Sequence, residues 1–254
     1  MSASFTPQAA VVTGAGRGIG RAIALELARA GADVALLARS RDELAESAAQ
    51  VRALGGNALI VPIDLGDLGQ IDSAVKRIRN EVGTADVLVN NAGVVWPLGP
   101  SDGVDPAEWA RAITINLTAV ATLTLALLPA MLTERRGRIV NVSSGAAERP
   151  SSMIGGNAYV TGKTALEAHT LNLAAELADS GVTVNVFRPG TVDTAMQSWI
   201  RGQEATKIGA DLHERFVRYH ADGVLITPEQ SAHSLVELLH DTSTGQIWTV
   251  SDPG

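Results

Sequence analysis

The sequence of 254 residues contains no cysteine. Disulfide bonds and thiolate zinc sites are therefore excluded, and the five histidines fall at no zinc-ligand spacing. We accordingly expect no metal site. A cytoplasmic enzyme is the simplest interpretation of a chain without these groups.

The chain also lacks an uninterrupted apolar run of the ~18–20 residues that cross a membrane. The longest candidate, residues 117–132, contains three threonines and Pro129, so we predict a buried helix there. No basic region followed by an apolar core begins the chain, so no signal peptide is expected. The net charge of −7 comes without a basic stripe, and neither nucleic acid nor a membrane is an expected partner.

What the sequence does contain is short apolar segments that alternate with amphipathic ones. Strands in which nearly every residue is apolar indicate a parallel sheet that is covered on both faces. We predict an α/β fold: a single doubly wound, Rossmann-like parallel sheet of about seven strands. No linker or repeat is visible, so residues 1–254 are expected to form one domain. The predicted strands are 9–12, 34–38, 57–63, 86–90, 138–142, 182–187 and 246–250, and the predicted helices are 21–30, 41–54, 67–82, 106–133 and 157–178.

A glycine-rich turn, residues 13–20, joins the first strand to the first helix. Glycines let the backbone approach a pyrophosphate, and a helix N-terminus offers free N–H groups. Ile19 stands where the strict G-x-G-x-x-G pattern has its last glycine, and a plain turn is the alternative. Ligands of doubly wound sheets bind beyond the carboxyl ends of the strands. We therefore expect one site formed by the loops 14–19, 38–41, 64–65, 90–93, 143–144 and 189–194.

The end of the second strand favours NADP(H) over NAD. Asp33 precedes that strand, at the opposite edge of the sheet, and is rejected as a ribose ligand. Arg39 and Arg41 follow the strand, and Arg17 lies in the glycine turn; arginine can bind a 2′-phosphate in a bidentate way. The alternative is that Arg39 and Arg41 are solvated charges at a helix start.

Tyr159 and Lys163 lie four residues apart on a predicted helix and so share a face. We expect the ammonium group to favour the phenolate and to lower the tyrosine pKa, which would make Tyr159 a general acid/base near neutral pH. The chain has only two tyrosines, so chance pairing is uncommon. A core tyrosine beside a surface lysine is the alternative.

Taken together, these motifs resemble those of the short-chain dehydrogenase/reductase family, of the ~250-residue type. The resemblance covers residues 9–250. It rests on Thr13-Gly14-x-x-x-Gly18-Ile19-Gly20, Asn90-Asn91-Ala92-Gly93, Ser143-Ser144, Tyr159-x-x-x-Lys163 and Pro189-Gly190-Thr191-Val192-Asp193-Thr194.

The resemblance implies an oxidoreductase that interconverts a ketone and a secondary alcohol. Tyr159 would exchange the proton, Lys163 would bind the nicotinamide ribose, Ser144 would bind the substrate oxygen, and Asn116 would hold a relay water. Asp64 would bind the adenine amine, with Leu65 beside the ring, and Thr194 with Val192 would fix the carboxamide. The implied cofactor-binding residues are Gly14, Arg17, Gly18, Ile19, Arg39, Asp64, Leu65, Asn91, Ala92, Gly93, Tyr159, Lys163, Pro189, Gly190, Val192 and Thr194.

The gap from Ser144 to Tyr159 is slightly longer than in similar enzymes, which leaves the choice between Ser143 and Ser144 partly open. We favour Ser144 and expect the Ser143 hydroxyl to bond to backbone. The resemblance implies a helical substrate lid at residues 195–223. We expect Arg201 in this segment to be solvated, and the alternative is that it binds a substrate carboxylate or phosphate. A 3-oxoacyl thioester, a small ketone or a keto-sugar are the substrate options.

The helices 106–133 and 157–178 carry more apolar surface than one sheet face needs, and in the family they build a dimer face. We predict a homotetramer, or a homodimer, formed through them; Leu123, Leu127, Leu128, Leu171 and Ala174 are among the candidate contacts. Two alternative functions remain. One is a catalytically silent dinucleotide-sensing regulator or scaffold, and the other is a nucleotide-sugar epimerase or dehydratase, which usually has a longer C-terminal region.

Overall fold

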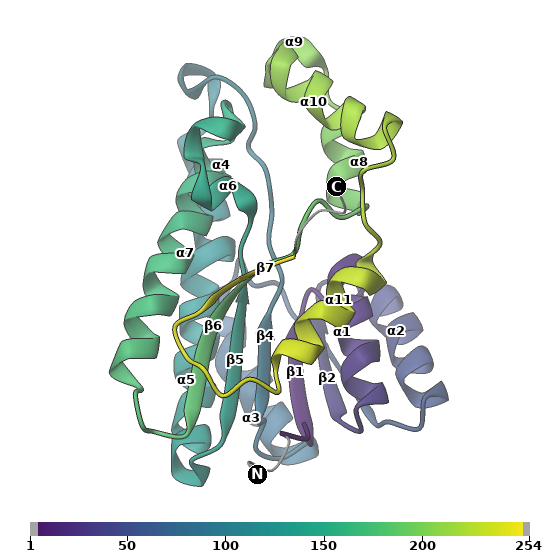
Figure 1. The fold of residues 1–254 in the computed structure, drawn as a ribbon, viewed down its shortest axis with the longest axis vertical. Coiled ribbons are helices and arrows are strands. Elements are labelled where there is room, and N and C mark those ends of the chain that lie inside the picture. Colours follow the sequence, from purple (N-terminus) through teal and green to yellow (C-terminus); the bar gives the residue numbers. More distant parts are fainter. Residues whose placement is uncertain (1–4, 251–254) are drawn as a thin grey trace.

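The computed structural model describes residues 5–250, and a seven-stranded sheet lies at its centre (Figure 1). The strand order is β3-β2-β1-β4-β5-β6-β7, and every neighbouring pair is parallel. The predicted doubly wound α/β fold is therefore confirmed. The strands are β1 (Ala9–Thr13), β2 (Asp33–Ala38), β3 (Ala58–Pro62), β4 (Val87–Asn90), β5 (Gly137–Val142), β6 (Val182–Arg188) and β7 (Ile247–Thr249).

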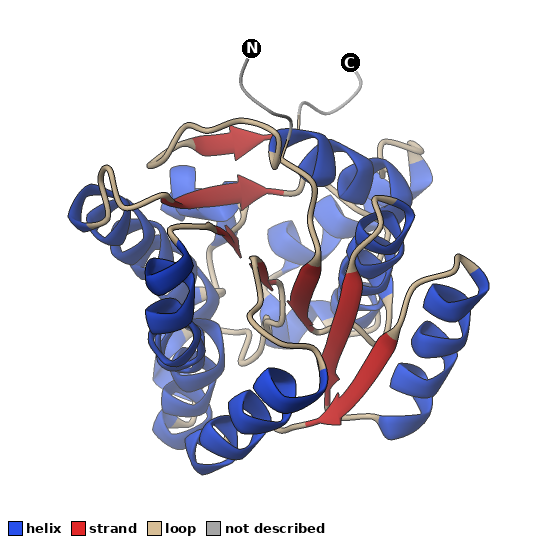
Figure 2. Cartoon of the chain, turned by 90° about the horizontal axis from the view of Figure 1, so that it is seen from below, coloured by secondary structure: helices blue, strands red, loops and turns tan. Residues whose placement is uncertain are grey.

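Helices cover both faces of the sheet (Figure 2). Alternate strand residues point to opposite faces, so an all-apolar strand feeds two cores. Val12 and Leu36 belong to one buried cluster, and Val11 and Leu37 to the other. The first cluster packs under α1 (Gly18–Arg29), α2 (Arg41–Ala53) and α11 (Pro228–Leu238), and the second under α3 (Ile71–Glu81), α5 (Ala119–Glu134) and α7 (Asn157–Glu176).

The predicted helix 106–133 consists of α4 (Pro106–Ile113), a π-helical turn (Thr114–Thr118) and α5. The Asp105 side chain caps its start by accepting a bond of 2.8 Å from the Ala107 N–H. By length and composition, Pro106–Glu134 could cross a membrane, but half of its most apolar window is buried. Leu123 and Met131 are fully enclosed under the sheet, so the apolar character of this helix serves the core.

Several short elements differ from the prediction. The predicted loop 143–156 contains α6 (Gly145–Glu148) and a 3-10 turn (Pro150–Met153), and helix α11 was not predicted. Both helices are set by local caps, because Ser144 caps α6 and Thr227 with Gln230 forms a capping box on α11. Residues 144–148 carry no periodic pattern. Ala232, Leu235, Val236 and Leu239 do follow a helical spacing, so α11 was detectable from the sequence and was overlooked.

Residues 195–223 form three helices beyond the carboxyl edge of the sheet: α8 (Ala195–Arg201), α9 (Ala205–Ile208) and α10 (Ala210–Ala221). Their apolar side chains do not join either main core. They pack instead in a third cluster that includes Tyr159, together with Val95, Met153, Ile200, Ile208, Leu212 and Phe216. The predicted lid segment therefore lies against the predicted catalytic tyrosine.

Candidate active site

The glycine-rich turn after β1 tolerates no side chains at its tightest points. A Cβ on Gly20 would lie 2.2 Å from the Gly14 carbonyl oxygen, and one on Gly14 would lie 2.8 Å from Asn91 Nδ2. Gly18 has a φ of +53°, and a Cβ there would meet nothing nearer than Thr194 Cγ2 at 3.7 Å. The turn is thus pressed against β4 on one side and open toward the end of β6 on the other, which suits a backbone that cradles a phosphate.

We expect Gly20→Ala to destabilise the fold by about 1–3 kcal/mol, because the new methyl group would overlap backbone that cannot move away. Urea unfolding at pH 7 measures the effect. Gly103→Ala is the matched control, since a Cβ there meets nothing within 4 Å. Equal unfolding midpoints for the two variants would contradict the tight contact at Gly20.

The segment after β4 is hydrogen-bonded directly to the glycine turn. Asn91 Nδ2 donates to the Thr13 carbonyl oxygen over 2.9 Å, and the backbone N–H groups of Asn91 and Ala92 each donate to Thr13 Oγ1 over 3.0 Å. Thr13 therefore holds two predicted cofactor loops together. This role of the Thr13 hydroxyl group could not be predicted from the sequence, because only the β1–β4 adjacency in space reveals it.

Asn116 and Lys163 converge on Gly93. Asn116 lies in the π-helical turn, where it exchanges two hydrogen bonds of 2.8 Å with the backbone of Val94. A Cβ on Gly93 would lie 3.1 Å from Asn116 Oδ1 and 3.3 Å from Lys163 Nζ, so a side chain here would press on both polar groups. Lys163 Nζ donates to the Val142 carbonyl oxygen over 2.7 Å and is buried. π-turns often occur at functional sites, and this one places Asn116.

Tyr159 is buried and hydrogen-bonded to the Ser144 side chain. Burial raises the pKa of Tyr159, and the bond to Ser144 partly lowers it. The expectation that Lys163 lowers this pKa is wrong for the free protein, because Lys163 Nζ is 6.0 Å from the ring centroid and bonds elsewhere. Burial also lowers the pKa of Lys163 itself to about 8.

Ser143 differs from the prediction of a bond to backbone. Its hydroxyl donates to Glu167 Oε1 over 2.7 Å, and Arg188 donates to both oxygens of the same carboxylate over 2.9 Å. Sequence reasoning missed Glu167 and Arg188. The spacing offered one signal for Glu167, which follows Lys163 by four residues on the same helix.

The rim after β2 carries exposed arginines. Arg39 follows β2 directly and is exposed, while Arg17 Nη1 lies 3.3 Å from Glu43 Oε1 with 62% of its side chain exposed. Asp33 is the first residue of β2, so it lies at the opposite edge from these groups, although inside the strand rather than before it.

The remaining predicted cofactor residues follow β3 and β6. Asp64 pairs with Arg111 over 3.0 Å, and the neighbouring Leu65 is buried in the second core cluster. In the glycine turn, Ile19 is partly buried against the first core cluster. After β6, Pro189 leads to Gly190, which has a φ of +78°. Val192 bridges to Ile226, and Thr194 caps α8 by accepting from the Gln197 N–H over 3.4 Å. All these segments follow parallel strands, so they lie along one edge.

Arg201 is not the solvated lid arginine that we expected. Only 16% of its side chain is exposed, and it donates to Ser198 Oγ over 3.0 Å with Asp193 at 3.9 Å.

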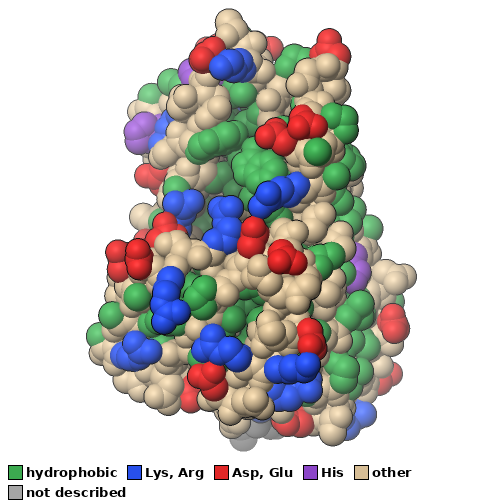
Figure 3. Space-filling model, turned by 180° about the vertical axis from the view of Figure 1, so that it is seen from behind, with side chains coloured by type: hydrophobic (Ala, Val, Ile, Leu, Met, Phe, Trp, Pro, Cys, Tyr) green, Lys and Arg blue, Asp and Glu red, His purple; other side chains and the backbone are tan. Residues whose placement is uncertain are grey.

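Seen from behind, hydrophobic side chains line the hollow between the upper parts of the molecule, with Lys and Arg side chains beside it (Figure 3). Within residues 5–250, no group of three acidic or histidine side chains is placed to hold a metal ion.

Comparisons with known proteins identify the family. The model of the short chain dehydrogenase family matches residues 8–205. A short chain dehydrogenase of Pseudocercospora fijiensis is 36% identical over 191 residues, which cover 74% of this chain and 60% of that protein. The 3-oxoacyl-(acyl-carrier-protein) reductase FabG of Escherichia coli is 38% identical over 200 residues, which cover 76% of this chain and 77% of that protein.

Two solved structures extend the likeness to almost the whole chain. A variant of actinorhodin polyketide ketoreductase with NADPH has a TM-score of 0.87 at 30% identity and covers 96% of each chain. An NAD⁺-bound xylitol dehydrogenase has a TM-score of 0.84 at 27% identity and covers 96% of this chain and 98% of that one. The protein therefore belongs to the short-chain dehydrogenase/reductase family.

Proposed function

We propose that this oxidoreductase uses NADP(H) to interconvert a ketone and a secondary alcohol, with Tyr159 as the general acid/base. The observation that carries the proposal is the buried Tyr159 hydroxyl, hydrogen-bonded to Ser144 beneath a hydrophobic lid cluster. A phenol in this position can donate a proton to a carbonyl oxygen as that oxygen gains charge. Ser144 would bind the same oxygen and stabilise the developing charge.

The bound nicotinamide would supply or accept the hydride, and the protein would orient it. The chain fits such a group in two ways. The glycine turn leaves backbone open at Gly18 opposite Thr194, and Gly93 keeps a space between Asn116 and Lys163 that a side chain would fill. Lys163 would bind ribose hydroxyl groups at that space, and its charge would favour the Tyr159 phenolate once both face the same ligand.

Arg39 and Arg17 support the choice of NADP(H), because guanidinium groups match a 2′-phosphate. Structural relatives are known with NADPH and with NAD⁺, so the choice rests on these side chains. We expect Arg39→Asp to weaken NADPH binding about 10- to 100-fold, the value of a charge-assisted hydrogen bond, and to leave NADH binding little changed. Titration of cofactor fluorescence measures both constants.

Arg79→Asp, on the exposed side of α3, makes the same charge change away from the site and serves as the control. If the wild-type protein bound NADH more tightly than NADPH, the cofactor assignment would be wrong.

A panel of 3-oxoacyl thioesters, small ketones and keto-sugars, followed by NADPH absorbance, tests the proposed reaction. The 3-oxoacyl-(acyl-carrier-protein) reductase among the relatives supports including the first class. A dinucleotide-sensing regulator is the second candidate, and it predicts tight NADPH binding with no turnover of any member of the panel. Against it stands the presence of Ser144 beside Tyr159, together with the burial of Tyr159 and Lys163 on α7.

We further propose a cytoplasmic homotetramer or homodimer formed through α4–α5 and α7. Leu123, Leu127, Leu128 and Ala174 are buried within the chain, so they are wrong as subunit contacts. Leu125, Leu132 and Leu171 are exposed by 57%, 36% and 38%, and they are the better candidates. Light scattering at micromolar concentration gives the mass; a monomer would rule out this assembly.

A further inference from the structure

A buried ionic cluster lies directly behind the proposed catalytic residues. It consists of Ser143, Glu167 and Arg188, all less than 10% exposed, with Glu148 at its outer end. Arg188 donates to both Glu167 oxygens over 2.9 Å, Ser143 donates to one of them over 2.7 Å, and Glu148 lies 3.3 Å from Arg188. None of these residues has a role in the reaction proposed above.

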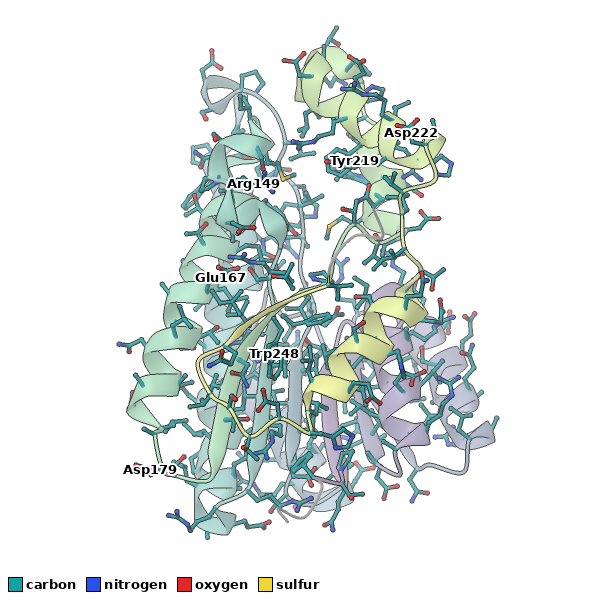
Figure 4. All side chains as sticks on the ribbon, in the orientation of Figure 1. Arg149, Glu167, Asp179, Tyr219, Asp222 and Trp248 are labelled. Atoms are coloured by element: carbon teal, nitrogen blue, oxygen red, sulfur yellow. The ribbon has the colours of Figure 1, made fainter. Side chains whose placement is uncertain are left out.

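Each member of the cluster is next to a segment of the site. Ser143 precedes Ser144 at the end of β5, and Arg188 precedes Pro189 at the end of β6. Glu167 lies one helical turn after Lys163 on α7, beside the strands (Figure 4). The carboxylate thus ties the helix that carries Tyr159 and Lys163 to the ends of two strands.

The charges of this region are nearly balanced. Tyr159, Lys163 and Glu167 lie on α7, Arg188 on β6 and Glu148 on α6, while β5 presents the neutral Val142 carbonyl to Lys163. Burial lowers the pKa of Lys163, and the charge of Glu167 raises it, to a net value of about 8. Glu167 is the charged group that favours the ammonium form of Lys163.

We infer that Glu167 is a positioning residue that acts through Lys163: it supplies the negative charge that keeps the lysine protonated, and Arg188 and Ser143 hold its carboxylate in place. This role rests on the function proposed above. A purely structural tie would also connect α7 to the sheet, but its loss would change stability without changing the titration of Lys163.

The titration of Lys163 can be observed directly, because the chain has three lysines, and Lys76 and Lys207 are about 70% exposed. In protein labelled with ¹³C-lysine, the ε-carbon signals give three titration curves, which Lys76→Arg and Lys207→Arg assign. Glu167→Gln removes the charge and keeps the shape. We expect the Lys163 midpoint to fall by about 1 pH unit, because an opposite charge is lost and Arg188 keeps only the exposed Glu148 as its partner.

Two variants complete the test. Glu148→Gln makes the same neutralisation at the exposed end of the cluster and should shift the midpoint less than Glu167→Gln does. The double variant Glu167→Gln/Arg188→Met leaves no buried charge unpaired, because Glu148, which loses Arg188 as its partner, is exposed to water; this protects folding if the single variant is unstable. It should also lower the midpoint. A Lys163 midpoint at or above the wild-type value in the folded variants would overturn the inference.

The alkaline limb of kcat/KM for NADPH-dependent ketone reduction gives a second readout. It should move to lower pH in Glu167→Gln together with the ¹³C midpoint, because the ammonium form would be lost earlier. The NMR measurement needs neither cofactor nor turnover. A wild-type protein without ketone reduction would therefore defeat the proposed function, whereas an active protein with an unshifted Lys163 in Glu167→Gln would defeat only this inference.

Discussion

Tyr159→Phe is expected to reduce kcat for ketone reduction about 10²- to 10⁴-fold, the usual contribution of a positioned general acid. The substitution removes the hydroxyl group that is hydrogen-bonded to Ser144 and leaves the ring in the lid cluster. NADPH binding should change little, since the ring and Lys163 remain. Steady-state kinetics with cofactor titration separates the two effects.

The chain provides a matched control in its other tyrosine. Tyr219 lies on α10, with its ring centroid 6.0 Å from that of Phe216, and Tyr219→Phe makes the same chemical change in the lid (Figure 4). It should retain most of the activity. If Tyr159→Phe retained activity as well, the assignment of the general acid would be wrong.

Lys163→Met is expected to stabilise the protein while it abolishes activity. The buried ammonium has a pKa of about 8, against 10.5 when exposed, so keeping it charged costs about 3 kcal/mol of folding free energy at pH 7. Methionine removes that cost but loses the bond to Val142, worth about 1 kcal/mol. We therefore expect a net gain of about 2 kcal/mol at pH 7, measured by urea unfolding.

The pH dependence gives a second check on the same variant. Between pH 8 and 10.5 the unfolded wild-type chain binds more protons at Lys163 than the native one, so this group makes stability rise with pH. Lys163→Met should lack that rise, and the two proteins should converge as pH increases. Lys207→Met, at an exposed lysine, is the control and should behave as the wild type. A Lys163→Met variant less stable than wild type at pH 7 would refute the burial cost.

The features that follow from local hydrophobicity and from strand order were predictable from the sequence. Apolar runs such as residues 34–38 have no stable place except a doubly covered strand, so the parallel sheet followed from them. The rule on carboxyl ends then placed the loops that carry Gly14, Asn91 and Ser144 along one edge before any contact was known.

Features that depend on contacts across the chain were not predictable. The bond from Ser143 to Glu167 joins residues 24 positions apart, and no local pattern distinguishes it from a bond to backbone. Arg188 directly follows the predicted strand 182–187, and its carboxylate partner Glu167 lies 21 positions earlier, on α7. The pKa of Tyr159 was predicted in the wrong direction because spacing reports shared faces, whereas burial and the actual hydrogen-bond partner decide the shift.

Transfer of deuterium tests the central claim most directly. NADPH that carries deuterium at the transferable position of the nicotinamide is incubated with the wild-type protein and each ketone of the panel, and the alcohols are analysed by mass spectrometry. The account predicts at least one alcohol with one deuterium on the former carbonyl carbon, formed by the wild type and by Tyr219→Phe but not by Tyr159→Phe. Absence of deuterated alcohol from every ketone, with NADPH bound, would contradict it.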